Sequence, residues 1–154
     1  MLRPDLLPDH AWIAAHIPHQ GGMCLLDRVL AWDAQHIRCS ATSHRSPANP
    51  LREQGRLGAA NAVEYAAQAM AVHGALLAGA GRPLGAGYLA SVRGVRLHAE
   101  RMDDMADDLQ VEATRLSGDD AVILYAFTVG TAGRCLAEGR ASVVLDAASF
   151  PATP

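Results

Sequence analysis

Residues 59–80 constrain the fold more than any other stretch of the chain, because they have the pattern of one long and mostly apolar helix. Alanine, the residue with the highest helix propensity, dominates the stretch. Apolar residues surround most of its circumference, which is typical of a helix inside a protein core. The stretch is long enough to suggest a membrane span, but Glu64 and other polar residues interrupt it, and charges are costly at mid-bilayer. We therefore expect a buried core helix and no membrane partner.

The polar residues of this predicted helix are not scattered. At about 100° per residue, Asn61, Glu64 and Gln68 fall on one narrow stripe, and His73 lies on the opposite side. Two interpretations of Glu64 remain open. It is either a hydrogen-bonded structural carboxylate or a catalytic one in an apolar pocket, where desolvation would hold its pKa near the working range.

Composition narrows the function classes. The chain has 154 residues, half of them hydrophobic, and a net charge of −3, so it has no electrostatic footprint for nucleic acid. Cys24, Cys39 and Cys135 lie far apart without a CxxC spacing, so the sequence indicates no metal site and no disulfide framework. The first residues lack the apolar region of a signal peptide, and we expect a cytoplasmic protein.

Strand-like segments flank the helix. Two precede it and four follow it, and we expect the last four to form a meander; the segments are 23–32, 37–42, 88–98, 109–114, 121–129 and 136–145. This order predicts an α+β hot-dog fold, in which a curved antiparallel sheet wraps around one long central helix. We expect a single domain over 1–154 with its core at about 13–146. Such a sheet has an exposed edge, which a second subunit would cover.

Two motifs resemble those of a known family. Residues 17–29, IPHQGGMCLLDRV, are similar to the N-terminal signature of FabZ-type 3-hydroxyacyl-acyl-carrier-protein dehydratases. Residues 64–70, EYAAQAM, resemble the helix motif of that family, a Glu followed four residues later by a Gln. The loop element Asn49-Pro50-Leu51 and the helix pattern VEYAAQ place the resemblance closest to the ApeP-like dehydratases of aryl-polyene and related lipid pathways.

The resemblance implies an activity and partners. It implies removal of water from a 3-hydroxyacyl thioester to give a trans-2-enoyl thioester, with the acyl group carried on the phosphopantetheine of an acyl carrier protein. It implies no metal and no organic cofactor. The family forms hot-dog dimers, so a homodimer or a heterodimer with a second hot-dog subunit is expected, with the site shared between a His of one subunit and the helix carboxylate, here Glu64, of the other.

One position departs from the family pattern. Asn49 stands where the related proteins carry the catalytic His, and an amide has no useful basicity. Three alternatives follow. Glu64 transfers the proton alone, His44 of the same loop replaces the missing base, or the chain is a catalytically weak acyl-binding or partner subunit. A hot-dog thioesterase, which uses a carboxylate to activate water, is a further alternative.

The remaining candidate residues surround this predicted site. Gln68 is expected to orient Glu64 or to anchor the loop, and Tyr65 either lines the pocket or packs in the core. Leu57 and Gly58, at the end of the loop before the helix, are expected to contact substrate. A structural role is the favoured interpretation of His19. A second set, Arg93, Arg96 and Arg101, is either a solvated face or a docking patch for a carrier protein.

Overall fold

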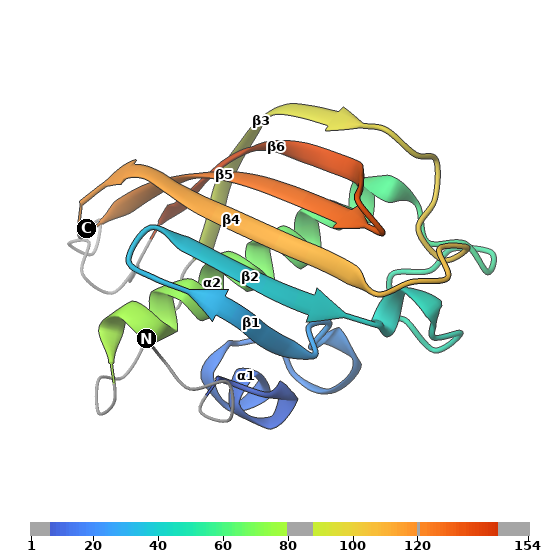
Figure 1. Cartoon of the computed structure of the whole chain (residues 1–154), viewed down its shortest axis with the longest axis horizontal. Helices are drawn as coiled ribbons and strands as arrows, with labels where there is room; N and C mark the ends of the chain where they lie inside the picture. The colour runs from blue at the N-terminus through green and yellow to red at the C-terminus, as the bar shows by residue number, and fades with distance from the viewer. Residues whose placement is uncertain (1–6, 80–87, 120, 145–154) are drawn as a thin grey trace, which may run out of the picture.

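The computed structural model describes residues 7–79, 88–119 and 121–144, which form one curved sheet around a central helix (Figure 1). The helix α2 spans Ala62–Ala78, and a single 3₁₀ turn, Ala59–Asn61, precedes it. The predicted helix is therefore confirmed, although its first residues are 3₁₀ and residue 80 lies outside the described residues. The strands are β1 (Arg28–Trp32), β2 (His36–Ala41), β3 (Tyr88–Leu97), β4 (Leu109–Gly118), β5 (Val122–Thr131) and β6 (Arg134–Val144).

All neighbouring strands of the sheet are antiparallel, in the order β1-β2-β4-β5-β6-β3. The predicted four-stranded meander is wrong for its first member, because β3 pairs with β6 at the edge rather than with β4. Strand β3 is irregular at Gly94, since this glycine has a φ of 61° and the register shifts between Arg93 and Arg96. The α+β hot-dog fold itself is confirmed.

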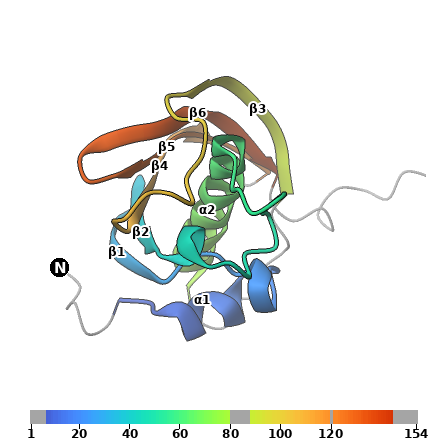
Figure 2. The ribbon, with the colours of Figure 1, turned by 90° about the vertical axis from the view of Figure 1, so that its right-hand side faces the viewer.

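Helix α2 lies in the hollow of the sheet, against β2, β4, β5 and β6 (Figure 2). Its buried positions include Ala62, Ala66 and Ala69, which are all fully shielded from solvent. The small alanine side chains let the inner face of the sheet approach the helix closely, as the sequence predicts. The same core cluster contains larger side chains from the strands, among them Ile37, Val111 and Phe127.

The segment before β1 differs from its prediction. The expected strand 23–32 begins only at Arg28, and Gly21–Met23 form a 3₁₀ turn after the short helix α1, His10–His16. Leu25 and Leu26 are nevertheless completely buried, so their apolar character reflects packing rather than strand formation. This segment runs along α2, where its backbone groups form hydrogen bonds with the side chain of Gln68.

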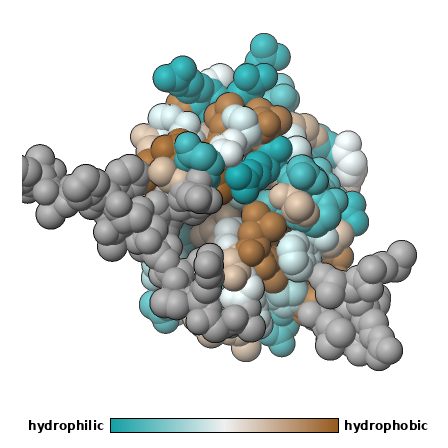
Figure 3. All heavy atoms as spheres, turned by 90° about the vertical axis from the view of Figure 1, so that its left-hand side faces the viewer, coloured by the Kyte–Doolittle hydropathy of each residue, from teal (hydrophilic) through white to brown (hydrophobic). Residues whose placement is uncertain are grey.

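The surface carries scattered apolar side chains among polar ones. Figure 3 shows such patches at the end of the molecule where α2 stops and β5 begins. Among the described residues, no helix combines the length and the apolarity that a membrane span needs.

The close approach of α2 and the sheet can be tested at Ala66. Ala66→Leu places a bulky side chain where a fully buried methyl group packs, so the free energy of unfolding should fall by about 1–3 kcal/mol. Ala60→Leu, at an exposed position just before α2, is the matched control and should change it by about 0.5 kcal/mol or less. Urea denaturation followed by circular dichroism measures both. Equal losses in the two variants would show that the helix face is not tightly packed.

Candidate active site

Gln68 fastens the loop before β1 to the central helix. Its side chain is fully buried on α2, where its Nε2 donates to the carbonyl oxygen of Met23 at 2.7 Å and its Oε1 accepts from the amide of Leu25 at 2.9 Å. The Met23 carbonyl and the Leu25 amide lie outside the strands, so the side-chain amide of Gln68 supplies the donor and the acceptor that these backbone groups need. The Gln68 Nε2 also lies 3.3 Å from Glu64 Oε1, one turn earlier on the helix.

Glu64 and His19 form the centre of the candidate site. The Nε2 of His19 lies 3.0 Å from Glu64 Oε1, and the two side chains are 25% and 31% exposed. His19 lies in the loop that Gln68 holds, between α1 and the turn at Gly21. A carboxylate from the first turn of the helix and an imidazole from the loop therefore share one partly solvated position, reachable from outside the protein.

The electrostatics of Glu64 differ from the expectation for a desolvated carboxylate. The hydrogen bond from His19 lowers the pKa of Glu64 and outweighs the raising effect of burial, and the Gln68 amide lowers it further. Glu64 is thus an ionised carboxylate at neutral pH, ready to accept a proton. The helix N-terminus also favours negative charge in this first turn.

The structure places His19 against Glu64, a contact that the sequence did not predict. Its Nε2 contacts Glu64, and its Nδ1 is buried without a hydrogen-bond partner among the described residues. The pairing joins positions 45 residues apart, by the difference between 64 and 19, so no local motif links them. The Pro-His dipeptide at 18–19 was the one available signal.

Asn49 lies in a hydrogen-bond network that holds the loop before α2. Its Nδ2 donates to the carbonyl oxygen of Ser43 at 2.9 Å and to the hydroxyl of Tyr65 at 3.1 Å, and its Oδ1 accepts from the amide of Leu51 at 2.9 Å. The Tyr65 hydroxyl also lies 2.7 Å from Ser43 Oγ. Asn49 is only 6% exposed and Tyr65 is fully buried, so both side chains pack in the core here.

His44 lies in a separate buried position. Its Nε2 faces the carbonyl oxygens of Met105 and Asp107 at 3.1 and 3.0 Å, as expected for a neutral ring that donates through Nε2. Burial lowers the pKa of His44, which favours that neutral form. No hydrogen bond joins His44 to Glu64, so the structure does not bring these two predicted site residues together.

Leu57 and Gly58 lead directly into the helix. Leu57 is fully buried, and its amide donates to Asp103 Oδ1 at 2.9 Å. Gly58 lies opposite Arg101 in an isolated β-bridge, and its carbonyl oxygen accepts from both nitrogens of Asn61. Among the described residues, the amide of Gly58 has no partner, so it is a free donor close to the start of α2.

A metal ion bound at Glu64 would have His19 as its second ligand, and these two side chains alone do not complete a ligand set. Among the described residues, one group gathers three such side chains: His98, Cys135 and Glu138, on β6 and at the end of β3.

The fold and the site together define a hot-dog subunit that presents a carboxylate from the first turn of its central helix. The chain belongs to the ApeP-like family of ApeP dehydratases, whose family model matches residues 11–150. A search of curated proteins gives no match to the sequence.

Solved structures share the fold. The dehydratase heterocomplex ApeI:P from Xenorhabdus doucetiae superposes with a TM-score of 0.77 at 23% identity, over 86% of this chain and 90% of that chain. A mutant thioesterase from Pseudomonas aeruginosa gives 0.58 at 15% identity, over 90% and 95%. A hypothetical thioesterase with coenzyme A from Streptococcus pneumoniae gives 0.53 at 9% identity, over 76% and 83%. At these identities the likeness establishes the hot-dog fold.

The structural role of Asn49 can be tested by truncation. Asn49→Ala leaves the amide of Leu51 without its acceptor and removes one of the two hydrogen-bond partners of the Tyr65 hydroxyl, so the free energy of unfolding should fall by about 1–3 kcal/mol. Asn61→Ala removes the same group from a half-buried position with one local hydrogen bond, and should cost less. Urea denaturation compares the two variants. A smaller loss for Asn49→Ala than for Asn61→Ala would contradict the network.

The pKa of Glu64 predicts how stability depends on pH. Because the folded-state pKa is lowered, the ionised carboxylate stabilises the fold fully above its ordinary pKa of 4.5, and this contribution is lost as the pH falls through the folded value. The stability difference between the wild type and Glu64→Gln should therefore shrink from pH 7 to pH 3. The same pair of proteins carrying His19→Gln should show a flatter profile. An unchanged profile would mean that His19 does not set the pKa.

Proposed function

We propose that the protein is a 3-hydroxyacyl-[acyl-carrier-protein] dehydratase that forms a trans-2-enoyl thioester, in aryl-polyene or related lipid biosynthesis. Membership of the ApeP-like dehydratase family supports the reaction class. The observation that carries the proposal is the Glu64 carboxylate in the first turn of α2, held by His19 at 3.0 Å and by Gln68 at 3.3 Å.

Glu64 transfers the proton in this proposal. As a carboxylate it removes a proton from C2 of the substrate, and the electron pair moves into the thioester as an enolate. The electron pair then returns to form the C2–C3 double bond while the C3–O bond breaks. The protonated Glu64 gives its proton to the departing hydroxyl, so water leaves and the carboxylate is restored. The elimination is neither an oxidation nor a reduction, so the substrate supplies all the atoms and electrons it needs.

His19 acts as a positioning residue in this scheme. Its hydrogen bond keeps Glu64 ionised before the reaction and fixes the carboxylate in one orientation. Gln68 restrains the same oxygen from the helix side. In this scheme Glu64, with His19 from a different loop beside it, takes the place of the histidine base that the family pattern would put at position 49.

The start of α2 provides a place for the enolate oxygen. The positive end of the helix dipole and the free amide of Gly58 both favour developing negative charge. Glu64 lies in the first turn of α2, and Gly58 immediately precedes the 3₁₀ turn that leads into the same helix. From the sequence, Gly58 is expected to contact substrate, and its amide, unpartnered among the described residues, supports that use.

A second hot-dog subunit is the proposed macromolecular partner. Strand β3 has a neighbour on one side only, and it exposes Leu89, Val95 and Leu97 by 38–47%. An apolar and unpaired strand edge favours pairing with another sheet. The similar structure from Xenorhabdus doucetiae is a dehydratase heterocomplex, which supports a heterodimer; a homodimer is the alternative.

The acyl carrier protein is the proposed source of substrate. Arg93 on β3 lies directly opposite Arg140 on β6, and Arg96 follows on the same edge. Adjacent like charges favour an anionic partner, such as the phosphate of phosphopantetheine or the acidic surface of a carrier protein. Arg101 does not belong to this patch, because its guanidinium binds Asp103. The three cysteines are free, and we propose a cytoplasmic location.

The assay uses a 3-hydroxyacyl carrier protein and follows the enoyl product, with the protein alone and with a co-expressed hot-dog homologue. Glu64→Gln should lower kcat/KM by about 100-fold or more. His19→Gln should shift the acidic limb of the pH profile to higher pH, because it removes the main cause that lowers the pKa of Glu64. Asn49→His restores the histidine that the family pattern places at position 49, and it tests whether the protein lacks activity because that base is missing.

Three outcomes would overturn the proposed reaction, and a fourth would change the role assigned to His19. Full activity of Glu64→Gln would remove the carboxylate from the mechanism, and an unmoved pH profile in His19→Gln would reduce His19 to packing. Free thiol without enoyl product would indicate a thioesterase. Activity that arises only in Asn49→His would identify a binding or partner subunit.

A further inference from the structure

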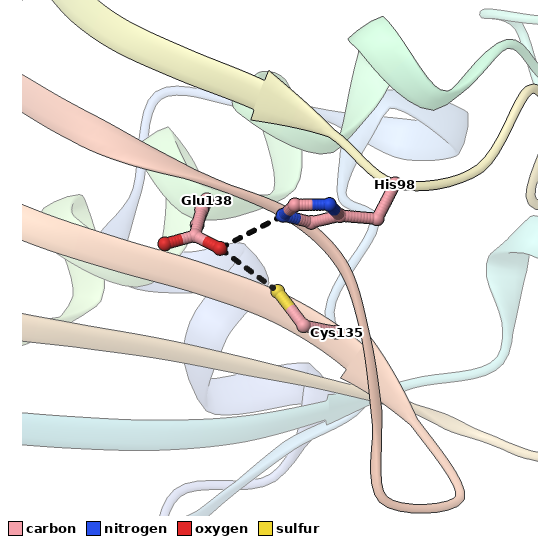
Figure 4. Close-up of side chains that lie close together, drawn as sticks. All are labelled: His98, Cys135 and Glu138. Carbon is pink, nitrogen blue, oxygen red and sulfur yellow. Dashed lines mark hydrogen bonds and ion pairs between the residues drawn. The ribbon is translucent and has the colours of Figure 1, made fainter.

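Three potential metal ligands meet on the outer face of the sheet, on the opposite side from α2. His98 directly follows β3, and Cys135 and Glu138 lie on β6, so the pairing of these two strands brings them together. Figure 4 shows the three side chains pointing toward one another. Their ligand atoms all lie within 4.8 Å of one another.

The distances suit a small tetrahedral ion after slight side-chain rotation. The Nε2 of His98 lies 2.8 Å from Glu138 Oε2, and Cys135 Sγ lies 3.9 Å from the same oxygen. Zinc bonds of about 2.0–2.3 Å at tetrahedral angles place ligand atoms roughly 3.3–3.6 Å apart. The His–Glu contact must therefore open by a few tenths of an ångström, to about the separation that zinc imposes.

The backbone beneath the cluster is already fixed. The amide of His98 donates to the carbonyl oxygen of Leu136 at 2.8 Å, and the Arg134 guanidinium donates to the carbonyl oxygen of His98 at 3.3 Å. Arg96 lies opposite Glu138 on β3, but no ion pair joins them in the structure. Glu138 thus has His98 as its ion-pair partner, and a metal ion would take over that contact.

The chemistry of the three groups selects the ion. Calcium and magnesium prefer oxygen ligands throughout, whereas an imidazole, a thiolate and a carboxylate together suit zinc. Burial and the neighbouring Glu138 raise the pKa of the Cys135 thiol, so the thiol is protonated in the metal-free protein. Coordination to a divalent ion releases that proton.

We propose that His98, Cys135 and Glu138 bind one Zn²⁺ ion, with a fourth position open to water or another ligand. The ion would link the end of β3 to β6, and so fasten the strand that lies at the edge of the sheet. The site is independent of the proposed dehydratase reaction, because Glu64 lies on the other side of the sheet on α2. No local sequence motif indicates the site, because its ligands come from positions 98, 135 and 138.

Calorimetry with ZnCl₂ on the full chain tests the proposal. The wild type should bind one equivalent, and Cys135→Ser and His98→Gln should each weaken the affinity by about tenfold or more. His36→Gln is the matched control, because His36 pairs with Glu112 at 4.0 Å on the same sheet without a thiol nearby. This variant should bind zinc as the wild type does. Circular dichroism confirms that each variant is folded.

Cobalt provides a second readout that a nonspecific surface interaction would not give. Co²⁺ added to the wild type should produce a thiolate-to-cobalt absorption band, which Cys135→Ser should lose. Undiminished zinc binding in Cys135→Ser and His98→Gln, a cobalt spectrum without the thiolate band, or no binding by the wild type would each overturn the proposal. Dehydratase activity measured on the same samples reports on Glu64 separately, so the two proposals fail independently.

Discussion

The buried amide of Gln68 is the interaction on which the candidate site depends. It is fully shielded from solvent, and it binds the backbone at Met23 and Leu25 while reaching Glu64 from the helix. Leaving a buried amide or its backbone partners unsatisfied costs about 1–3 kcal/mol for each group. The loop therefore has one favourable position along α2, and that position sets His19 beside Glu64. The hydrogen bonds of Gln68 that hold the loop in the fold thus also set the geometry of the candidate site.

The departure at Asn49 acquires a structural explanation in this arrangement. A catalytic histidine must be free to exchange protons, whereas the Asn49 amide is used by Ser43, Tyr65 and Leu51. The side chain at position 49 therefore stabilises the loop, and His19 is the imidazole that reaches the carboxylate. Acid–base chemistry in this subunit would consequently rest on Glu64, with its ionisation controlled from the N-terminal loop rather than from the loop before α2.

The sequence correctly predicted the features that depend on the spacing of nearby residues. The Ala-rich helix, the alternating strands and the common face of Glu64 and Gln68 follow from spacings of one to four residues. The position of β3 beside β6 did not follow, because strand order depends on contacts distant in sequence. Met23 to Asp27 had the apolar character of a strand, yet the Gln68 amide bonds this segment instead. The lowered pKa of Glu64 could not be predicted from the sequence, because it depends on the position of His19 in the tertiary structure.

We propose that Glu64, held by His19 and Gln68, faces the reacting carbons of a 3-hydroxyacyl substrate. A crystal structure with a 3-hydroxyacyl pantetheine analogue, in which an amide replaces the thioester, tests this most directly, in the presence of a partner subunit if one binds. We expect C2 and the C3 hydroxyl to lie next to the Glu64 carboxylate, with the His19 contact retained and the amide carbonyl near the start of α2. An analogue bound with these carbons against another group, and with Glu64 facing solvent, would contradict it.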